Sequence, residues 1–543
     1  MDLRSISANQ ITLWLMLALG LVVALVIGSA VGNSDTRFVA AAMAVIPVAV
    51  IFVNLKTNIW VLLPIGWYLT GRLPWLPLPF SLRNLCFLAV IAVFILLVAT
   101  RAFPWKRKGS MLEYLIYINL AYLITVYIRN PTGFFALQSS MVGGRPYMEV
   151  ILAFAAFLIL SRVRISDSIA RIFPLFFVIP AWSVGILDAI GRVYPPFGYV
   201  LNSFYSGAGP SGTFGAVQAE AELGTTRLTG LQDAGVSGAL FLCARYNPIT
   251  LISPLYPWRV IMTAMVFGVL FLAGFRSMLL FAFVAFFLSS ILRGKLHDLW
   301  ITICGGVLAL VFLIALQGTV LHLPLTMQRA LSWLPGDWDP AAVLDAEAST
   351  EWRVEMWEWA WNDDRILRNK IWGQGFGLTL DDMNLIATSL AAGQGGSSLL
   401  GGSDRELFMI NGTFHSGPIS TVKYIGIVGF SLYFPLMCYM GLLAWRLCKK
   451  ARGTEAFTLA LFVGIPIIYE PFNFIFVFGG LDGNYPQLLF WAGLLNMTSN
   501  YLDSVKASGI MHTEIASLKA LELMGTASPR PKPPLPHQAA VIN

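Results

Sequence analysis

The chain has 543 residues, of which 57% are hydrophobic and only 12% charged, and its mean hydropathy is +0.70. Soluble domains carry about 25% charged residues, so this composition excludes a soluble protein and indicates a polytopic membrane protein. The net charge of +7 is spread over many loops rather than gathered in one basic patch, which argues against nucleic-acid binding.

Apolar runs recur along the chain, and a helix needs about 20 such residues to cross a bilayer. They predict an all-α polytopic fold with about 12–14 transmembrane helices. The lower count applies because one run is short and another pair is interrupted by proline. The first run has a second interpretation as a signal peptide with Arg4 as its basic end. The expected segments are 11–31, 38–54, 58–71, 84–100, 112–128, 147–162, 169–190, 236–254, 258–275, 277–292, 299–317, 421–446, 456–478 and 484–498.

Lysine and arginine in short loops indicate the orientation, because positive charge is retained on the cytoplasmic side. The basic loops at 101–108, 162–164, 293–295 and 449–452 all fall on one side of the predicted membrane. This rule places both termini in the cytoplasm and the segments at 129–146, 191–235 and 318–420 outside.

Four parts follow from this layout: N-terminal transmembrane helices at 1–317, a large outer loop at 318–420, C-terminal transmembrane helices at 421–498, and a cytoplasmic tail at 499–543. The proline-rich end of the tail disfavours helix, so we expect the tail to be disordered. The outer loop carries thirteen acidic and six basic residues. An anionic substrate must therefore be held by particular arginines rather than by the loop's overall charge.

One helix is predicted inside the outer loop, with Ser349 or Thr350 as its N-cap. Arg353, Trp357 and Trp361 recur at a spacing of four and so share one face of this helix. Tryptophan prefers the membrane interface. Arg353 then has two interpretations, either as a contact to a lipid headgroup or as a ligand for a lipid-linked phosphate.

A histidine and two further arginines complete the candidate site. His415 stands just before the apolar run that re-enters the membrane, and its ordinary pKa suits proton transfer, although a structural role is the alternative. Arg276 lies between two apolar runs with almost no loop, where a charge is costly. Arg227 ends the second outer loop. Guanidinium groups bind the oxygens of a diphosphate bidentately, so these residues suit a diphosphate-linked substrate.

The order of these motifs resembles the O-antigen ligase and O-antigen polymerase superfamily of bacterial envelope proteins. The similarity covers roughly residues 220–450. It consists of Arg227-x-x-Gly230, Gly-Phe-Arg-Ser around Arg276, Arg353-x-x-x-Trp357 followed by Gly373-Gln-Gly375, and His415 followed by Gly426-Ile-Val-Gly429.

The resemblance implies a glycosyltransferase at the periplasmic face of the bacterial inner membrane, surrounded by membrane lipid. Such an enzyme transfers a glycan from undecaprenyl diphosphate to an acceptor hydroxyl with inversion, without metal or cofactor. Its partners would be the carrier-linked glycan and an acceptor glycan or lipid A core. Arg276 and Arg353 would hold the diphosphate, Arg227 and Trp357 would bind substrate, and His415 would be the base.

Several alternatives stay open. His415 is followed by Ser-Gly-Pro, and Phe precedes Arg276, which departs from the family pattern and leaves ligase and polymerase undistinguished. The base is either His415 or one of the loop carboxylates Glu355, Glu358 and Asp404. The rival class is a transporter or flippase of a lipid-linked glycan.

Overall fold

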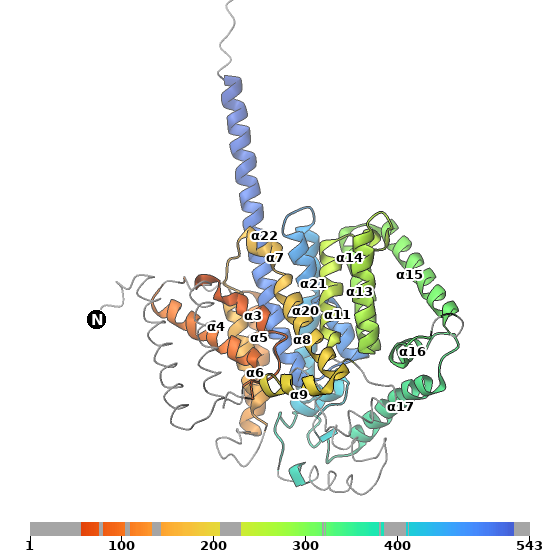
Figure 1. The fold of residues 1–543 in the computed structure, drawn as a ribbon. Helices are drawn as coiled ribbons and strands as arrows, with labels where there is room; N and C mark the ends of the chain where they lie inside the picture. The colour runs from red at the N-terminus through yellow and green to blue at the C-terminus, as the bar shows by residue number, and fades with distance from the viewer. Residues whose placement is uncertain are drawn as a thin grey trace, which may run out of the picture.

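The computed structural model describes residues 56–74, 80–101, 103, 109–132, 143–206, 228, 230–317, 320, 322–379, 382–384, 409–410 and 412–525. These residues are mostly helical and contain no β-strand beyond one isolated bridge (Figure 1). The predicted segments at 11–31 and 38–54, together with Arg227 and Asp404, lie outside the described residues.

Seven helices of the described part are long and apolar enough to cross a membrane. This confirms an all-α polytopic protein, whereas the total of 12–14 crossings stays a prediction. The candidate spans are α4 (Leu82–Ala99), α5 (Met111–Arg129), α7 (Asp167–Ile172) with α8 (Leu175–Val193), α14 (Arg276–Arg293), α15 (Leu296–Leu316), α20 (Gly417–Ala451), and α21 (Phe457–Phe472) with the π-helix η4 (Asn473–Val477).

Shorter or less apolar helices complete the described fold. Two predicted spans are divided: 58–71 contains η2 and α3, which are too short to cross a bilayer, and 236–254 is split before a proline into α11 and α12. The remaining helices are η2 (Lys56–Val61), α3 (Leu62–Gly66), α6 (Arg145–Leu160), α9 (Pro195–Phe204), α11 (Leu231–Arg245), α12 (Pro248–Ile252), α13 (Pro257–Ala273), α16 (Leu325–Leu331), α17 (Pro340–Asn362) and α22 (Leu481–Gly525).

Helix α22 continues beyond the predicted last transmembrane segment. The apolar pattern ends near residue 498, but the helix continues to Gly525. The disorder of the tail stays a prediction, and the prolines that would break a helix begin only in the stretch from Pro529 onward. That stretch lies outside the described residues.

Two of the basic turns, at 293–295 and 449–452, meet at one end of the helix bundle, which we call the basic end. Arg452 Nε donates to the Leu292 carbonyl at 2.9 Å, which joins the ends of α20 and α14. Arg171 on α7 pairs with Glu455 at 3.0 Å in the next turn. Tyr501 Oη on α22 donates to an Asp167 carboxylate oxygen at 2.9 Å.

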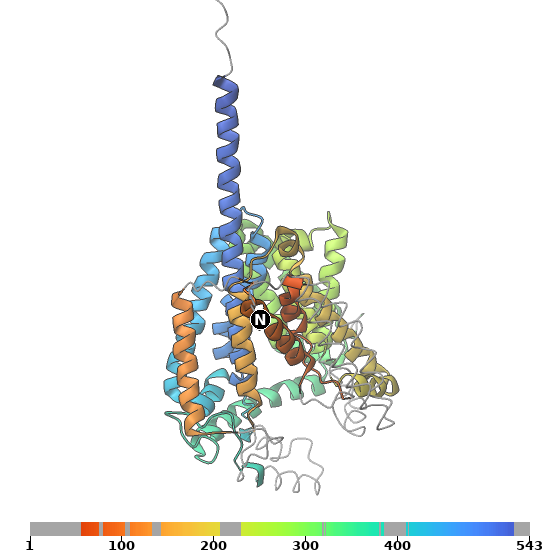
Figure 2. The ribbon, with the colours of Figure 1, turned by 90° about the vertical axis from the view of Figure 1, so that its left-hand side faces the viewer.

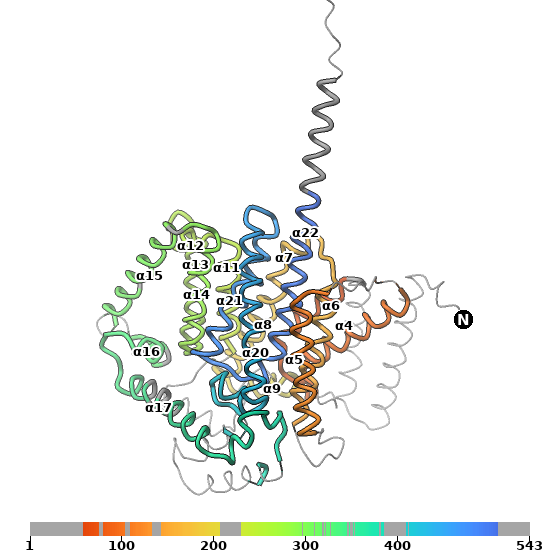
Figure 3. The backbone as a smooth tube through the Cα atoms, turned by 180° about the vertical axis from the view of Figure 1, so that it is seen from behind, coloured from red at the N-terminus to blue at the C-terminus, as the bar shows by residue number. Residues whose placement is uncertain are grey.

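The opposite end carries α9, α16, α17 and the first residues of α20, and we call it the site end (Figures 1 and 2). Helix α15 descends from the basic end to α16, which leads into α17 (Figure 3). Large buried side chains fill the bundle between the two ends, and Trp67 stacks on Phe490 with ring centroids 4.4 Å apart.

Candidate functional site

Helix α17 carries Arg353 and Trp357 and begins earlier than the sequence pattern predicts. Its N-cap is Asp339, whose carboxylate accepts a hydrogen bond from the Ala341 N–H at 2.8 Å. Pro340 at the first helical position adds a start signal, because its missing N–H costs nothing there. The predicted caps Ser349 and Thr350 lie inside the helix, so that prediction is wrong.

Trp357 connects α17 to the segment just before α20. Its indole Nε1 donates to the Phe414 carbonyl at 2.7 Å. Met356 and Ala360, on the same helix, are fully buried in one small core with Phe414. The residue that follows Phe414 is His415, so α17 fixes the position of the peptide that carries the histidine.

His415 adopts an unusual backbone conformation, with φ at +52°. Residues other than glycine seldom occupy the left-handed region, and such strain gathers at functional sites. The imidazole packs against Phe478 with ring centroids 5.1 Å apart. The next residues begin α20, where a side chain on Gly417 would collide with the Phe474 carbonyl.

The surroundings of His415 favour its neutral form. Burial first, and then the positive charge of Arg353, lower the pKa of His415 to about 4. Both causes disfavour imidazolium, because burial removes water and a nearby guanidinium repels a second cation. His415 is therefore neutral near pH 7 and able to accept a proton.

Arg276 lies at the start of α14, just after α13, at the same end of the molecule. It is the first residue of α14, after a turn in which Gly274 takes a left-handed φ of +73°. Since α14 ends at the basic end, beside Arg452, its first residue lies at the site end. The structure thus brings Arg353, Trp357 and His415 into one cluster and places Arg276 at the same end.

A break in helix α20 at Gly426 was not predicted from the sequence. The backbone there has φ +73° and ψ +177°, which is not helical. The N–H of Gln374 donates to the Lys423 carbonyl at 2.9 Å. The N–H of Gly375 donates to the Tyr424 carbonyl, also at 2.9 Å. The glycine loop after α17 thus satisfies carbonyls that the broken helix leaves open.

Two further hydrogen bonds satisfy the break, one on each side of Gly426. The N–H of Ile427 donates to the Lys370 carbonyl at 2.8 Å. Tyr122 Oη on α5 donates to the Ile425 carbonyl at 2.8 Å. Irregular backbone inside a membrane protein is tolerated only where its polar groups find such partners. The glycine motifs at 373–375 and 426–429 are therefore one structural unit, which we call the Gly426 junction (residues 370–375 and 423–428).

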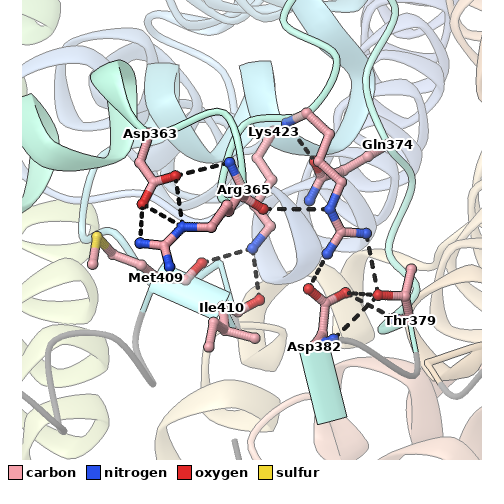
Figure 4. Close-up of polar contacts among 9 residues, drawn as sticks. Asp363, Arg365, Gln374, Thr379, Asp382, Met409, Ile410 and Lys423 are labelled. Atoms are coloured by element: carbon pink, nitrogen blue, oxygen red, sulfur yellow. Dashed lines mark hydrogen bonds and ion pairs between the residues drawn. The ribbon is translucent and has the colours of Figure 1, made fainter. Parts of the chain in front are cut away.

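A second feature that the sequence interpretation missed is Lys423, in the first turns of α20. Its side chain is only 4% exposed, and its Nζ donates to the Met409 and Ile410 carbonyls, both at 2.6 Å. Figure 4 shows this ammonium between the two carbonyls. A lysine inside the predicted apolar run at 421–446 was the available signal, because an intramembrane charge is by default a functional candidate.

Charged residues of the outer loop surround Lys423 (Figure 4). Arg368 forms an ion pair with Asp382, and the second Asp382 oxygen accepts a hydrogen bond from the Thr379 N–H at 2.7 Å. Glu355 and Glu358, the alternative bases on α17, are exposed. They lie away from the buried face that packs against the histidine segment.

No protein-family model matches the chain, and a search of curated proteins also finds no match. Within the described ranges, no group of three or more histidine, cysteine, aspartate or glutamate side chains is placed to hold a metal ion.

Proposed function

We propose that the protein is a membrane glycosyltransferase that moves a glycan from undecaprenyl diphosphate to an acceptor hydroxyl, of the O-antigen ligase or polymerase type. The observation that carries the proposal is the cluster at the site end. There a half-buried neutral histidine lies within the electric field of Arg353, and the Trp357 indole donates a hydrogen bond to the adjoining Phe414 carbonyl.

In the proposed reaction the neutral imidazole of His415 takes the proton of the acceptor hydroxyl. The acceptor oxygen forms a bond to the anomeric carbon, and the bond from that carbon to the diphosphate oxygen breaks, with inversion. The electron pair leaves with the diphosphate. Arg353 and Arg276, with Arg227 assisting, stabilise the charge on the leaving group, a task for which fixed cations are effective.

Donor binding would also strengthen the base. A bound diphosphate neutralises the charge of Arg353, which is one of the two causes of the low pKa of His415. The pKa then rises toward its ordinary value, and a base is most effective when its pKa lies near the working pH. His415 is thus the better base only when the donor is in place.

The exposed positions of Glu355 and Glu358 favour His415 over these carboxylates as the base. The proposed location is the bacterial inner membrane, with both termini in the cytoplasm and the site on the periplasmic face. The convergence of basic turns at the end opposite the site supports this orientation. The acceptor is a lipid A core in a ligase and a growing glycan in a polymerase.

The transporter alternative depends on charges inside the helix bundle. Asp188 on α8 pairs with Arg192 at 2.9 Å and accepts a hydrogen bond from the Gly230 N–H at 2.9 Å. Glu470 on α21 accepts hydrogen bonds from Asn484 and Asn473. Each carboxylate therefore has local structural partners, which favours the enzyme.

Replacing either arginine tests the proposal directly. We expect Arg276→Gln and Arg353→Gln each to lower the rate of transfer from the diphosphate donor by about 10²–10³-fold, because each removes transition-state charge stabilisation. Arg365→Gln is the control, because Arg365 is exposed and paired with Asp363 at 2.7 Å. Full activity in both site variants would contradict the arginine assignments.

The pH profile gives an independent expectation. Activity requires neutral His415, so kcat/KM falls as pH decreases through the pKa of the free enzyme, near 4 and well below the ordinary 6.5. In Arg353→Gln the acid limb should move upward, because one cause of the lowering is lost while burial remains. Measuring kcat/KM against pH for both proteins checks this, and an unmoved limb would show that Arg353 does not act on His415.

A further inference from the structure

Lys423 lies at the centre of the segments that bear the proposed site. Its ammonium donates hydrogen bonds to two consecutive carbonyls, those of Met409 and Ile410. The Met409 carbonyl also accepts a hydrogen bond from the Gly412 N–H at 3.1 Å. The same ammonium lies 5.6 Å from the ring centroid of Phe414, within cation–π range.

These contacts lead directly to His415. Phe414 is fully buried; the Lys423 ammonium contacts its ring, and the Trp357 indole donates a hydrogen bond to its carbonyl. The chain turns at Gly412, two residues before Phe414, and a side chain on Gly412 would collide with the hydroxyl of Tyr424. Residues 409–410 and 412–415 are therefore held between α17 and the first turns of α20.

The burial of Lys423 is costly, and it needs an explanation. A buried charge is costly to desolvate unless it is well paired, and Asp382, the carboxylate whose charge acts on it, is already bound to Arg368. A methionine would fill similar volume without that cost. The two carbonyl bonds fix the direction of the side chain in a way that an apolar residue cannot.

We propose that Lys423 is a positioning residue, which sets the place and burial of the His415 imidazole through residues 409–410 and 412–415. This inference rests on the proposed function for its catalytic consequence. The contacts that it uses do not depend on the reaction.

The test measures the imidazole itself. Diethyl pyrocarbonate modifies neutral histidine, so the pH dependence of His415 modification, followed by mass spectrometry, reports its pKa without any substrate. Arg353 is the charged group that acts on His415, and it is unchanged in the variants. The variants are Lys423→Met and, as a second variant that keeps amide donors, Lys423→Gln. The control is Lys370→Met, which removes a lysine paired with Asp364.

We expect the modification midpoint to rise by about one to two pH units in both Lys423 variants, because the loosened peptide exposes the ring to water. The midpoint should stay unchanged in the Lys370 control. The kcat for transfer should fall about 10–100-fold, as expected when a reacting group is misplaced by about 1 Å, with the donor KM unchanged.

A wild-type midpoint in folded Lys423→Met or Lys423→Gln protein would overturn the inference, as would a fall in kcat with no change in midpoint, which indicates a structural role alone. Failure of the wild-type protein to transfer glycan would instead overturn the proposed function, and the modification result would still decide whether Lys423 positions His415.

Discussion

His415→Asn is expected to lower transfer by about 10²–10⁴-fold, the usual contribution of a general base. Asparagine tolerates the left-handed conformation that His415 adopts at φ +52°. The substitution therefore removes the imidazole without adding backbone strain. The measurement is single-turnover transfer of a labelled glycan by purified wild-type and variant protein.

The control for this change is His297→Asn, in the first turn of α15 at the basic end. It should retain full activity. Equal activity of His415→Asn and wild type would remove the histidine from the mechanism and direct attention to the exposed carboxylates of α17.

Gly426→Ala is expected to destabilise the fold by more than about 4 kcal/mol, because two separate penalties coincide. Its φ of +73° with ψ near 180° belongs to a region that only glycine occupies readily. A Cβ there would also collide with the Ile371 carbonyl. Loss of monodisperse protein and a lowered Tm in a thermal unfolding series would check this.

Two other glycines serve as controls that distinguish backbone strain from steric collision. Gly453 has φ +79°, but a Cβ at this position would meet no atom within 4 Å, so Gly453→Ala should cost only about 1–2 kcal/mol from strain. Gly268, inside α13, also has open space, and Gly268→Ala should be neutral or slightly stabilising. A wild-type Tm in Gly426→Ala would show that the junction can relax, contrary to the described geometry.

Hydropathy alone predicts most of the helices in the described part of the chain, because an apolar run of bilayer length has few alternatives. The helix that carries Arg353 and Trp357 was also predicted, from a spacing of four residues. Its start was not, because Ser349 and Thr350 resemble caps as closely as Asp339 does. Local signals of equal strength cannot decide a boundary that tertiary packing sets.

The contacts of the Gly426 junction could not be predicted from sequence patterns. Glycines at 373, 375 and 426 were visible in the sequence, but about fifty residues separate the two motifs. No local sequence pattern predicts that the Gln374 N–H donates a hydrogen bond to the Lys423 carbonyl at 2.9 Å. The burial of Lys423 was hidden for the same reason, since its carbonyl partners come from the outer loop rather than from its own helix.

The most direct test of the account is transfer by the purified protein of a labelled glycan from undecaprenyl diphosphate to lipid A core or glycan acceptors, with EDTA present. A parallel liposome assay follows movement of the carrier-linked glycan between leaflets. The account predicts an inverted glycosidic product, release of undecaprenyl diphosphate in equal amount, and loss of both in His415→Asn. Movement between leaflets with no product from any acceptor would contradict it and identify a transporter.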